Sequence, residues 1–451
     1  ANGLDSGKQE NNFRPMEEYT TSGAILEVKG VISGTGSMVK VGYDTVILSG
    51  ANTYSGGTTI AGGKLAIGAD NALPTTGTVT TTANGVLDLN GQNQTIGTLN
   101  NVVTTTTTGS TQGFVTNGGT SIKTLTVGNG VTSDFVYSGV VQHNVALTKT
   151  GTAKLTLHNT NTYLGTTEVA GGTLALGVNG SNQDSAWLKI SGAGSTFDVS
   201  AKTSYVFDGV VSGGGTSAAG TNFASAATTN AARIAGNFTV GDNVGAVSQI
   251  GSLAPGNTTT TAGDQIGHIY TSADLTLAGG VTGAPVATPT DRFALQLGGA
   301  TANGSTLGWD GSVSWFSTNA LDYLNGVQGN IENHDYVNVG GTLNFNEDGR
   351  GVVSFVSGSG YTPGWGDIFN LFDWVTAMNL NGFNFNNQYD GTGDSSYDLD
   401  LPTLGTQAGT QLLWDTSLFT TYGVIVVVPE PSRALLLMFG LLALFWRRRR
   451  A

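Results

Sequence analysis

An internal duplication constrains this chain more than any other feature of its sequence. Residues 30–68 recur as residues 139–177 without a gap, at a constant offset of 109. Self-similarity of this kind is typical of stacked units, because one unit alone cannot bury its apolar face. The residues retained in both copies include a lysine, an Asn-Thr-Tyr triplet and a glycine pair: Lys40 and Lys149, Asn52-Thr53-Tyr54 and Asn161-Thr162-Tyr163, Gly62-Gly63 and Gly171-Gly172.

Apolar residues inside each copy come in short bursts that alternate roughly with period two and are bounded by Gly, Asn, Thr or Ser. This pattern predicts strands, and no burst reaches helix length. The 17-residue spacing from Leu48 to Leu65 suits one coil of a parallel β-solenoid, with Gly and Asn accepting positive φ at a corner. An antiparallel sandwich of similar hairpins is the alternative, but hairpins do not require matching corners. The residues expected to point inward are Leu48, Ile60, Leu65, Ile67, Leu157, Val169, Leu174 and Leu176.

We therefore predict an all-β fold: a right-handed parallel β-helix, a β-rich C-terminal cap and one short hydrophobic C-terminal helix. Residues 1–24 form an N-terminal segment, and either follow a removed signal peptide or begin a fragment. Residues 25–285 form the solenoid, and residues 286–428 form late coils and the cap. Aromatic residues thicken after Trp309, which favours strands of a cap over 366–375 and 413–428. Residues 429–451 form a separate tail.

Composition narrows the function classes. The chain has no cysteine, so it uses neither disulfides nor thiolate metal sites. Before residue 429 it holds 13 Lys and Arg against 30 Asp and Glu. That acidity disfavours nucleic acid and anionic lipid as partners.

Two segments carry a family resemblance. GANTYSGGTTIAGGKLAIG (50–68) and NTNTYLGTTEVAGGTLALG (159–177) resemble the autotransporter-associated β-strand repeat. That repeat is a β-solenoid unit of bacterial surface and secreted proteins. The resemblance implies an architecture and an exported protein, and it says nothing about catalysis.

The tail combines Pro429, Glu430 and Pro431 with an apolar stretch at 434–446 and a basic cluster, Arg447, Arg448, Arg449 and Arg450. Thirteen helical residues span about 20 Å, less than the roughly 30 Å of a bilayer core. The arginines favour a cytoplasmic end. An ordinary short membrane anchor is one interpretation.

The three parts together resemble the PEP-CTERM sorting signal. The resemblance implies a transient inner-membrane anchor in a Gram-negative bacterium, cut by an exosortase that recognises Pro429 to Pro431. The mature body would then lie on the cell surface or in an extracellular matrix, with exopolysaccharide as the partner class.

No catalytic constellation stands out. The histidines His143, His158, His268 and His334 are far apart in the sequence, and H-E-x-x-H, Gly-x-Ser-x-Gly and Walker A motifs do not occur. The loop from Asp390 to Asp400 could hold calcium, although a solvated acidic loop explains it more simply. We expect no catalytic, cofactor-binding or metal-binding residue and no enzyme activity.

The leading functional hypothesis is an exosortase-processed structural or adhesive protein of the cell surface or matrix. A polysaccharide-binding or polysaccharide-cleaving β-helix protein is the alternative, and cleavage would need ionisable residues that converge on one coil face. A self-transporting autotransporter would need a C-terminal barrel, whereas this sequence ends in an arginine-capped apolar stretch.

Overall fold

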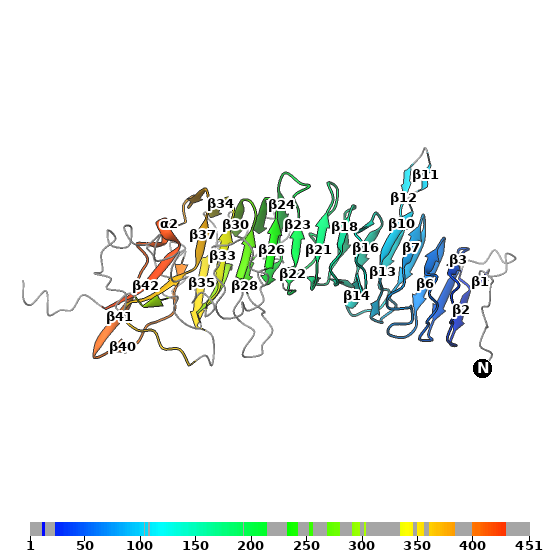
Figure 1. Ribbon diagram of the computed structural model, residues 1–451, viewed down its shortest axis with the longest axis horizontal. Coiled ribbons are helices and arrows are strands. Elements are labelled where there is room, and N and C mark those ends of the chain that lie inside the picture. Colours follow the sequence, from blue (N-terminus) through cyan, green and yellow to red (C-terminus); the bar gives the residue numbers. More distant parts are fainter. Residues whose placement is uncertain are drawn as a thin grey trace, which may run out of the picture.

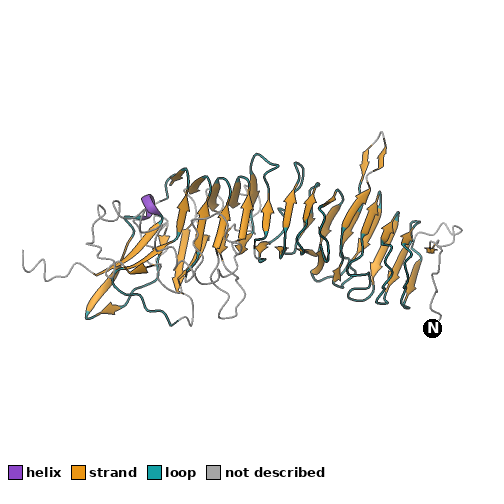
Figure 2. Cartoon of the chain, viewed as in Figure 1, coloured by secondary structure: helices purple, strands orange, loops and turns teal. Residues whose placement is uncertain are grey.

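The computed structural model shows an elongated β-solenoid that is closed at its C-terminal end by an antiparallel cap (Figure 1). Strands stack side by side along the long axis of the molecule (Figure 2). The structure describes residues 11–13, 23–102, 104–106, 109–192, 194–213, 232–241, 252–255, 268–279, 291–297, 302–303, 334–345, 350–355, 360–383 and 399–429.

The first coils are built from two parallel sheets. The five-stranded sheet contains β1 (Asn11–Phe13), β3 (Met38–Lys40), β5 (Thr58–Ile60), β7 (Val79–Thr82) and β10 (Leu99–Val102). The seven-stranded sheet contains β2 (Ile25–Val28), β4 (Thr45–Leu48), β6 (Gly63–Ile67), β8 (Gly85–Asp88), β13 (Phe114–Thr116), β16 (Val140–His143) and β19 (Thr162–Tyr163).

Three further parallel sheets carry the later coils. The ten-stranded sheet contains β9 (Gln94–Thr95), β14 (Lys123–Val127), β17 (Val145–Lys149), β20 (Thr167–Val169), β22 (Trp187–Ile190), β25 (Val210–Gly213), β28 (Ser252–Pro255), β31 (Asp291–Leu297), β35 (Arg350–Phe355) and β39 (Leu399–Asp400). The eight-stranded sheet contains β15 (Phe135–Tyr137), β18 (Lys154–Leu157), β21 (Thr173–Leu176), β23 (Thr196–Asp198), β26 (Ala232–Ala235), β29 (His268–Thr271), β33 (Tyr336–Val339) and β37 (Phe372–Trp374). A second five-stranded sheet contains β24 (Tyr205–Phe207), β27 (Phe238–Gly241), β30 (Leu275–Gly279), β34 (Thr342–Phe345) and β38 (Ala377–Asn379).

These sheets confirm the parallel architecture, and they continue beyond residue 285. The strands β29 and β33 pair in parallel, as do β30 and β34 and also β31 and β35. Late coils therefore stack on early ones in the same sheets.

The coil is longer than the sequence spacing predicted. Leu48 pairs with Ile67, and Leu157 pairs with Leu176, so strands in register lie 19 residues apart. The predicted spacing of 17 was wrong because it joined Leu48 to Leu65, which occupies a different position along its strand. Leu65 instead pairs with Val46.

The core consists of the inward-facing residues of successive strands. Along β4 and β18 buried residues alternate with half-buried or exposed ones, which is the period of two expected for a pleated strand. All eight residues that were expected to point inward are buried, each with at most 1% of its surface exposed.

The two sequence copies lie on different sheets of the solenoid. The first copy supplies β3 and β5 to the five-stranded sheet and β4 and β6 to the seven-stranded sheet. The equivalent strands of the second copy, β17, β20, β18 and β21, belong to the ten-stranded and eight-stranded sheets. The repeat is therefore a local unit that can occupy more than one side of the solenoid.

The Thr-rich stretch after β10 leaves the solenoid as an antiparallel hairpin of β11 (Thr104–Thr106) and β12 (Gly109–Thr111). This hairpin projects from the side of the rod in Figure 1, near β10. The chain then returns to the seven-stranded sheet at β13.

The cap is an antiparallel sheet of β32 (Ala302–Asn303), β36 (Asp367–Asn370), β42 (Val424–Pro429), β41 (Thr410–Asp415) and β40 (Thr406–Gln407). Its core includes Phe369, Phe419 and Val424 to Val427, all buried. Such a cap protects the strand edges and the apolar core that the last coil would expose. Two details differ from the prediction: β37 belongs to the solenoid, and Phe419–Tyr422 form a short helix, α2, in place of a strand.

Within the part of the chain that the structure describes, no helix is long and apolar enough to cross a membrane. The helix predicted at 434–446 lies outside the described residues.

Candidate functional site

The retained lysine of the first copy is buried and joins two coils by hydrogen bonds to their backbone carbonyls. We call this arrangement a lysine clasp. Lys40 has none of its surface exposed. Its Nζ donates hydrogen bonds to the carbonyl oxygens of Val41 and Gly42, at 2.8 and 2.9 Å. A third bond of 3.0 Å reaches the carbonyl of Gly62, in the next coil. The ammonium group therefore satisfies carbonyl groups at a corner that faces away from water.

Lys149 repeats this arrangement in the second copy. It is also fully buried, and its Nζ donates to the carbonyl oxygens of Thr150 and Gly151 at 2.6 and 3.3 Å. The bond to the next coil, 3.2 Å long, goes to Gly171. The same three acceptors, shifted by 109 residues, surround both amines.

The glycine pair makes the close approach of the two coils possible. Gly63 and Gly172 have φ values of 64° and 61°, in the left-handed region. A Cβ atom on Gly63 would lie 2.5 Å from the carbonyl oxygen of Gly42, and one on Gly172 would lie 2.6 Å from that of Gly151. Any larger residue would push apart the coils that the lysine joins.

Burial lowers the pKa of both lysines. For Lys149 the pKa falls from 10.5 to about 8, and the nearby charge of Asp134 opposes that change. For Lys40 the pKa is also lowered by burial and raised in part by Asp44. A lysine of lowered pKa can act as a catalytic amine, but these two amines are enclosed by backbone, so their position favours a structural role.

The retained asparagine of the triplet bonds the coil before it and the coil after it. The Oδ1 atom of Asn52 accepts the amide of Ile32 at 2.6 Å, and its Nδ2 donates to the carbonyl of Ala72 at 2.7 Å. In the second copy the Oδ1 atom of Asn161 accepts the amide of Val141 at 2.9 Å, and its Nδ2 donates to Ser181 at 3.0 Å.

Neither asparagine is among the residues with positive φ. The prediction that this asparagine adopts a positive φ at the corner was therefore wrong. Its side-chain amide instead forms hydrogen bonds with the neighbouring coils. Within the two copies the positive φ values belong to glycines and to His143, and elsewhere in the early coils Asn71, Asn84 and Asn90 also adopt positive φ.

The retained tyrosine anchors the same corner from inside the core. The hydroxyl groups of Tyr54 and Thr58 lie 2.6 Å apart, as do those of Tyr163 and Thr167. Burial raises the pKa of Tyr54 to about 12 and raises that of Tyr163 further. Both phenols therefore stay neutral at physiological pH.

Outside the two copies, other amide side chains also bond the backbone of neighbouring coils. Gln94 accepts the amide of Leu73 at 2.9 Å and donates to its carbonyl at 3.1 Å. Asn117 accepts the amide of Gly91 at 2.8 Å and donates to the carbonyl of Asn144 at 3.0 Å. Sequence reasoning missed these residues because neither lies in a repeated motif.

The late coils contain a buried polar row that sequence reasoning also missed. A ring nitrogen of His268 lies 3.2 Å from the carbonyl oxygen of His334, and a ring nitrogen of His334 lies 2.8 Å from that of Asn370. Tyr336 donates to Asp373 at 2.5 Å, and burial raises the pKa of both groups. The topology brings these residues together because β29, β33 and β37 are neighbours.

A comparison with protein families identifies the repeated unit. A model of the family described as passenger-associated-transport-repeat matches residues 38–67 and 147–176. The chain carries two copies of this autotransporter-associated repeat. The two matches begin at β3 and within β17, so they contain both lysine clasps and both Asn-Thr-Tyr corners. No curated protein and no solved structure matches the chain.

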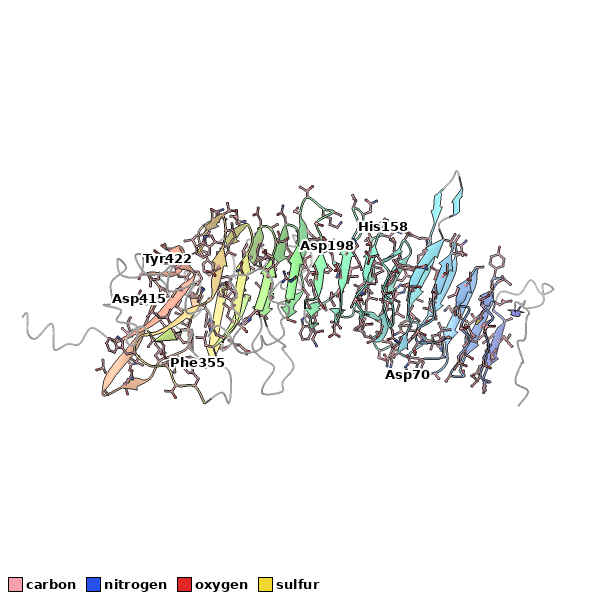
Figure 3. The ribbon with its side chains drawn as sticks, viewed as in Figure 1. Asp70, His158, Asp198, Phe355, Asp415 and Tyr422 are labelled. Atoms are coloured by element: carbon pink, nitrogen blue, oxygen red, sulfur yellow. The ribbon has the colours of Figure 1, made fainter. Side chains whose placement is uncertain are left out.

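Outside the repeat corners and the buried polar row of the late coils, ionisable side chains occur at many points along the rod. Figure 3 shows Asp70, His158, Asp198 and Asp415 at separate positions along the rod. His143 and His158, both in the second copy, are exposed. Among the described residues no group of three His, Asp or Glu side chains could hold a metal ion.

Most of the predicted sorting residues lie outside the described part of the chain. Pro429 is the last residue of β42, where it pairs with Leu412. Glu430, Pro431 and the cluster from Arg447 to Arg450 are not described. Of the acidic loop, Asp390, Asp394 and Asp398 are not described, and Asp400 lies in β39.

Proposed function

We propose that this chain is an exported structural or adhesive protein of the cell surface or extracellular matrix, and that an exosortase removes its tail. Repeats of the matched family are a feature of exported, surface-associated proteins, which supports the export part of the proposal. The chain would be held transiently in the inner membrane through 434–446 before it is released from that anchor.

One observation carries the structural role. The lysine, asparagine and tyrosine that both copies retain are buried, with at most 4% of their surface exposed. They bond neighbouring coils or neighbouring core groups, so the repeated residues serve stacking. In a repeat that formed a catalytic surface, the retained polar residues would instead be expected to face solvent.

The same observation supports the proposal that the protein is not an enzyme. Glycosidases and lyases need carboxylates and bases that converge on a substrate. We expect the purified full chain to leave acidic and neutral polysaccharides uncut. Release of oligosaccharides that a single carboxylate substitution abolishes would contradict this expectation.

Processing of the tail tests the sorting proposal. In a host with the matching exosortase, the mature protein should lack the peptide that contains Arg447 to Arg450, as judged by mass spectrometry. Replacing Glu430 and Pro431 with alanine should leave the uncut precursor in the inner membrane. Val428→Ala is a matched control for damage to the cap, because Val428 lies in β42 but outside the Pro429 to Pro431 motif. An intact tail on extracellular protein would show that the sorting assignment is wrong.

A further inference from the structure

Exposed apolar side chains gather at the end of the cap where β42 stops. Half of the surface of Trp365 and 42% of that of Leu413 are exposed, and Val428 is half-buried. Leu413 pairs with Val428 in the cap sheet. On the other side of β42, the amide of Gly366 donates to the carbonyl oxygen of Val427 at 2.8 Å. Trp365 and Leu413 thus flank the last residues of the same strand.

The connection between the end of β42 and the apolar stretch of the tail is short. Only residues 430–433 separate Pro429 from the apolar stretch at 434–446. The five Cα-to-Cα steps from Pro429 to Ala434 reach at most about 18 Å when fully extended. If the apolar stretch enters a bilayer, the end of β42 must lie within that distance of the bilayer surface.

We propose that this end of the cap rests in the lipid interface of the membrane that holds the tail, with Trp365 and Leu413 in contact with lipid. The inference deepens the proposed function and depends on its membrane anchor. Tryptophan favours the membrane interface because its ring is apolar and its N–H can stay hydrated. Because the connection is short, a bilayer that holds the apolar stretch lies against Trp365 and Leu413.

The acidic charge of the cap region restricts the proposed lipid contact to the small apolar surface around Trp365 and Leu413. Residues 356–428 contain seven Asp and no Lys or Arg. Residues 1–428 as a whole contain 13 Lys and Arg against 30 Asp and Glu, so anionic lipid repels the rod and disfavours a contact along its length. The first coils lie at the opposite end of the long axis (Figure 1), so the rod projects away from the bilayer.

Single-cysteine labelling of the full chain tests this geometry, because the chain contains no cysteine. An environment-sensitive fluorophore is placed at Trp365→Cys or Leu413→Cys, and the protein is reconstituted in phosphatidylcholine vesicles. The controls are Tyr43→Cys near the N-terminal end and Val178→Cys in the middle, which are 93% and 74% exposed. A fifth label, at Leu437→Cys, reports on the tail. Circular dichroism checks that each variant folds.

We expect lipids with a shallow spin label to quench positions 365, 413 and 437 severalfold more than positions 43 and 178. Quenching at 437 alone would overturn the proposed contact while leaving the membrane anchor in place. Quenching at 178 as strong as at 365 would overturn the end-on orientation. An absence of quenching at 437 would contradict the membrane anchor, and the proposed lipid contact of the cap would then fail as well.

Discussion

The two copies of the repeat make the same contacts on different sides of the molecule. Lys40 and Lys149 each donate to two carbonyls of their own corner and to one carbonyl of the next coil. Lys40 lies on β3 in the five-stranded sheet, whereas Lys149 lies on β17 in the ten-stranded sheet. The contacts therefore depend on the corner and its two neighbouring coils, and not on the sheet.

The copies differ in the hydrogen bonds that the threonine next to the buried tyrosine makes. The hydroxyl of Thr167, which bonds Tyr163, also donates to Ser185 at 2.9 Å and accepts from Asn182 at 3.0 Å. Thr58 in the first copy bonds Tyr54. The comparison predicts equal roles for lysine and asparagine in the two copies and unequal roles for tyrosine.

The largest effect is expected from removal of the lysine. Lys40→Ala or Lys149→Ala leaves three buried carbonyl oxygens without their donor and creates a cavity. Each change should lower the local free energy of unfolding by about 3 kcal/mol, measured by hydrogen exchange of the adjacent strands. Lys154→Ala, in an exposed position of β18, should change it by less than about 0.5 kcal/mol. A similar loss in Lys154→Ala and Lys149→Ala would contradict the clasp.

Removal of the asparagine amide should have the next largest effect. Asn161→Ala deprives the amide of Val141 and the carbonyl of Ser181 of a partner, at a cost of about 2 kcal/mol. Asn52→Ala should cost about the same in the first copy. The control is Thr160→Ala, at an exposed position. If only one copy loses protection from hydrogen exchange, the copies are not equivalent.

A smaller, pH-dependent effect is expected at Lys149. Its pKa in the folded protein is about 8, below its ordinary value of 10.5. Between these values the unfolded chain binds more protons than the folded one, so stability rises as pH increases from about 8 to 10.5. The carbonyl oxygens around Nζ favour the ammonium form and so limit the effect. Lys149→Met should remove this rise in stability of β17 and β18. A stability that falls across this range would show that the sign is wrong.

The smallest effect separates the two tyrosines. Tyr54→Phe should cost about 1 kcal/mol, because its buried hydroxyl loses its bond with Thr58 and a weaker one to the Met38 sulfur. Tyr163→Phe should cost less, because Thr167 keeps its other partners. Tyr43→Phe is the control, since Tyr43 is 93% exposed. Thermal and urea unfolding of the three variants give the order, and a larger loss for Tyr163→Phe would reverse our interpretation of the shared hydroxyl.

The sequence allowed the strands and the core to be predicted because alternation reports directly which side chains face inward. It did not show the coil length, because short strands do not reveal which residue of one strand stacks on which residue of the next. It also did not show the clasps. A retained lysine is ordinarily exposed, and only the enclosing backbone of the folded coil shows that Lys40 is buried.

The late polar row was beyond prediction for a different reason. His268 and His334 are 66 residues apart, and nothing between them marks β29 and β33 as neighbours. The short helix α2 was also missed. Phe419 and Tyr422 have high strand propensity, and the packing of Phe419 in the cap core overrides that preference.

Disulfide formation between engineered cysteines tests most directly whether both copies stack in the same way. Register partners lie 19 residues apart, at positions 47 and 66 in the first copy and 156 and 175 in the second. Neighbouring strands are about 4.8 Å apart, which suits a disulfide, whereas pairs offset by two residues are about 8 Å apart and do not.

We predict that Ile47→Cys with Ala66→Cys forms a disulfide in the full chain, and that Thr156→Cys with Ala175→Cys does so equally well. The 17-residue pairs, 47 with 64 and 156 with 173, should stay reduced under the same mild oxidation. Cross-linking of the 17-residue pairs, or of only one of the two 19-residue pairs, would contradict the claim that one repeated corner builds the same stacked coil twice.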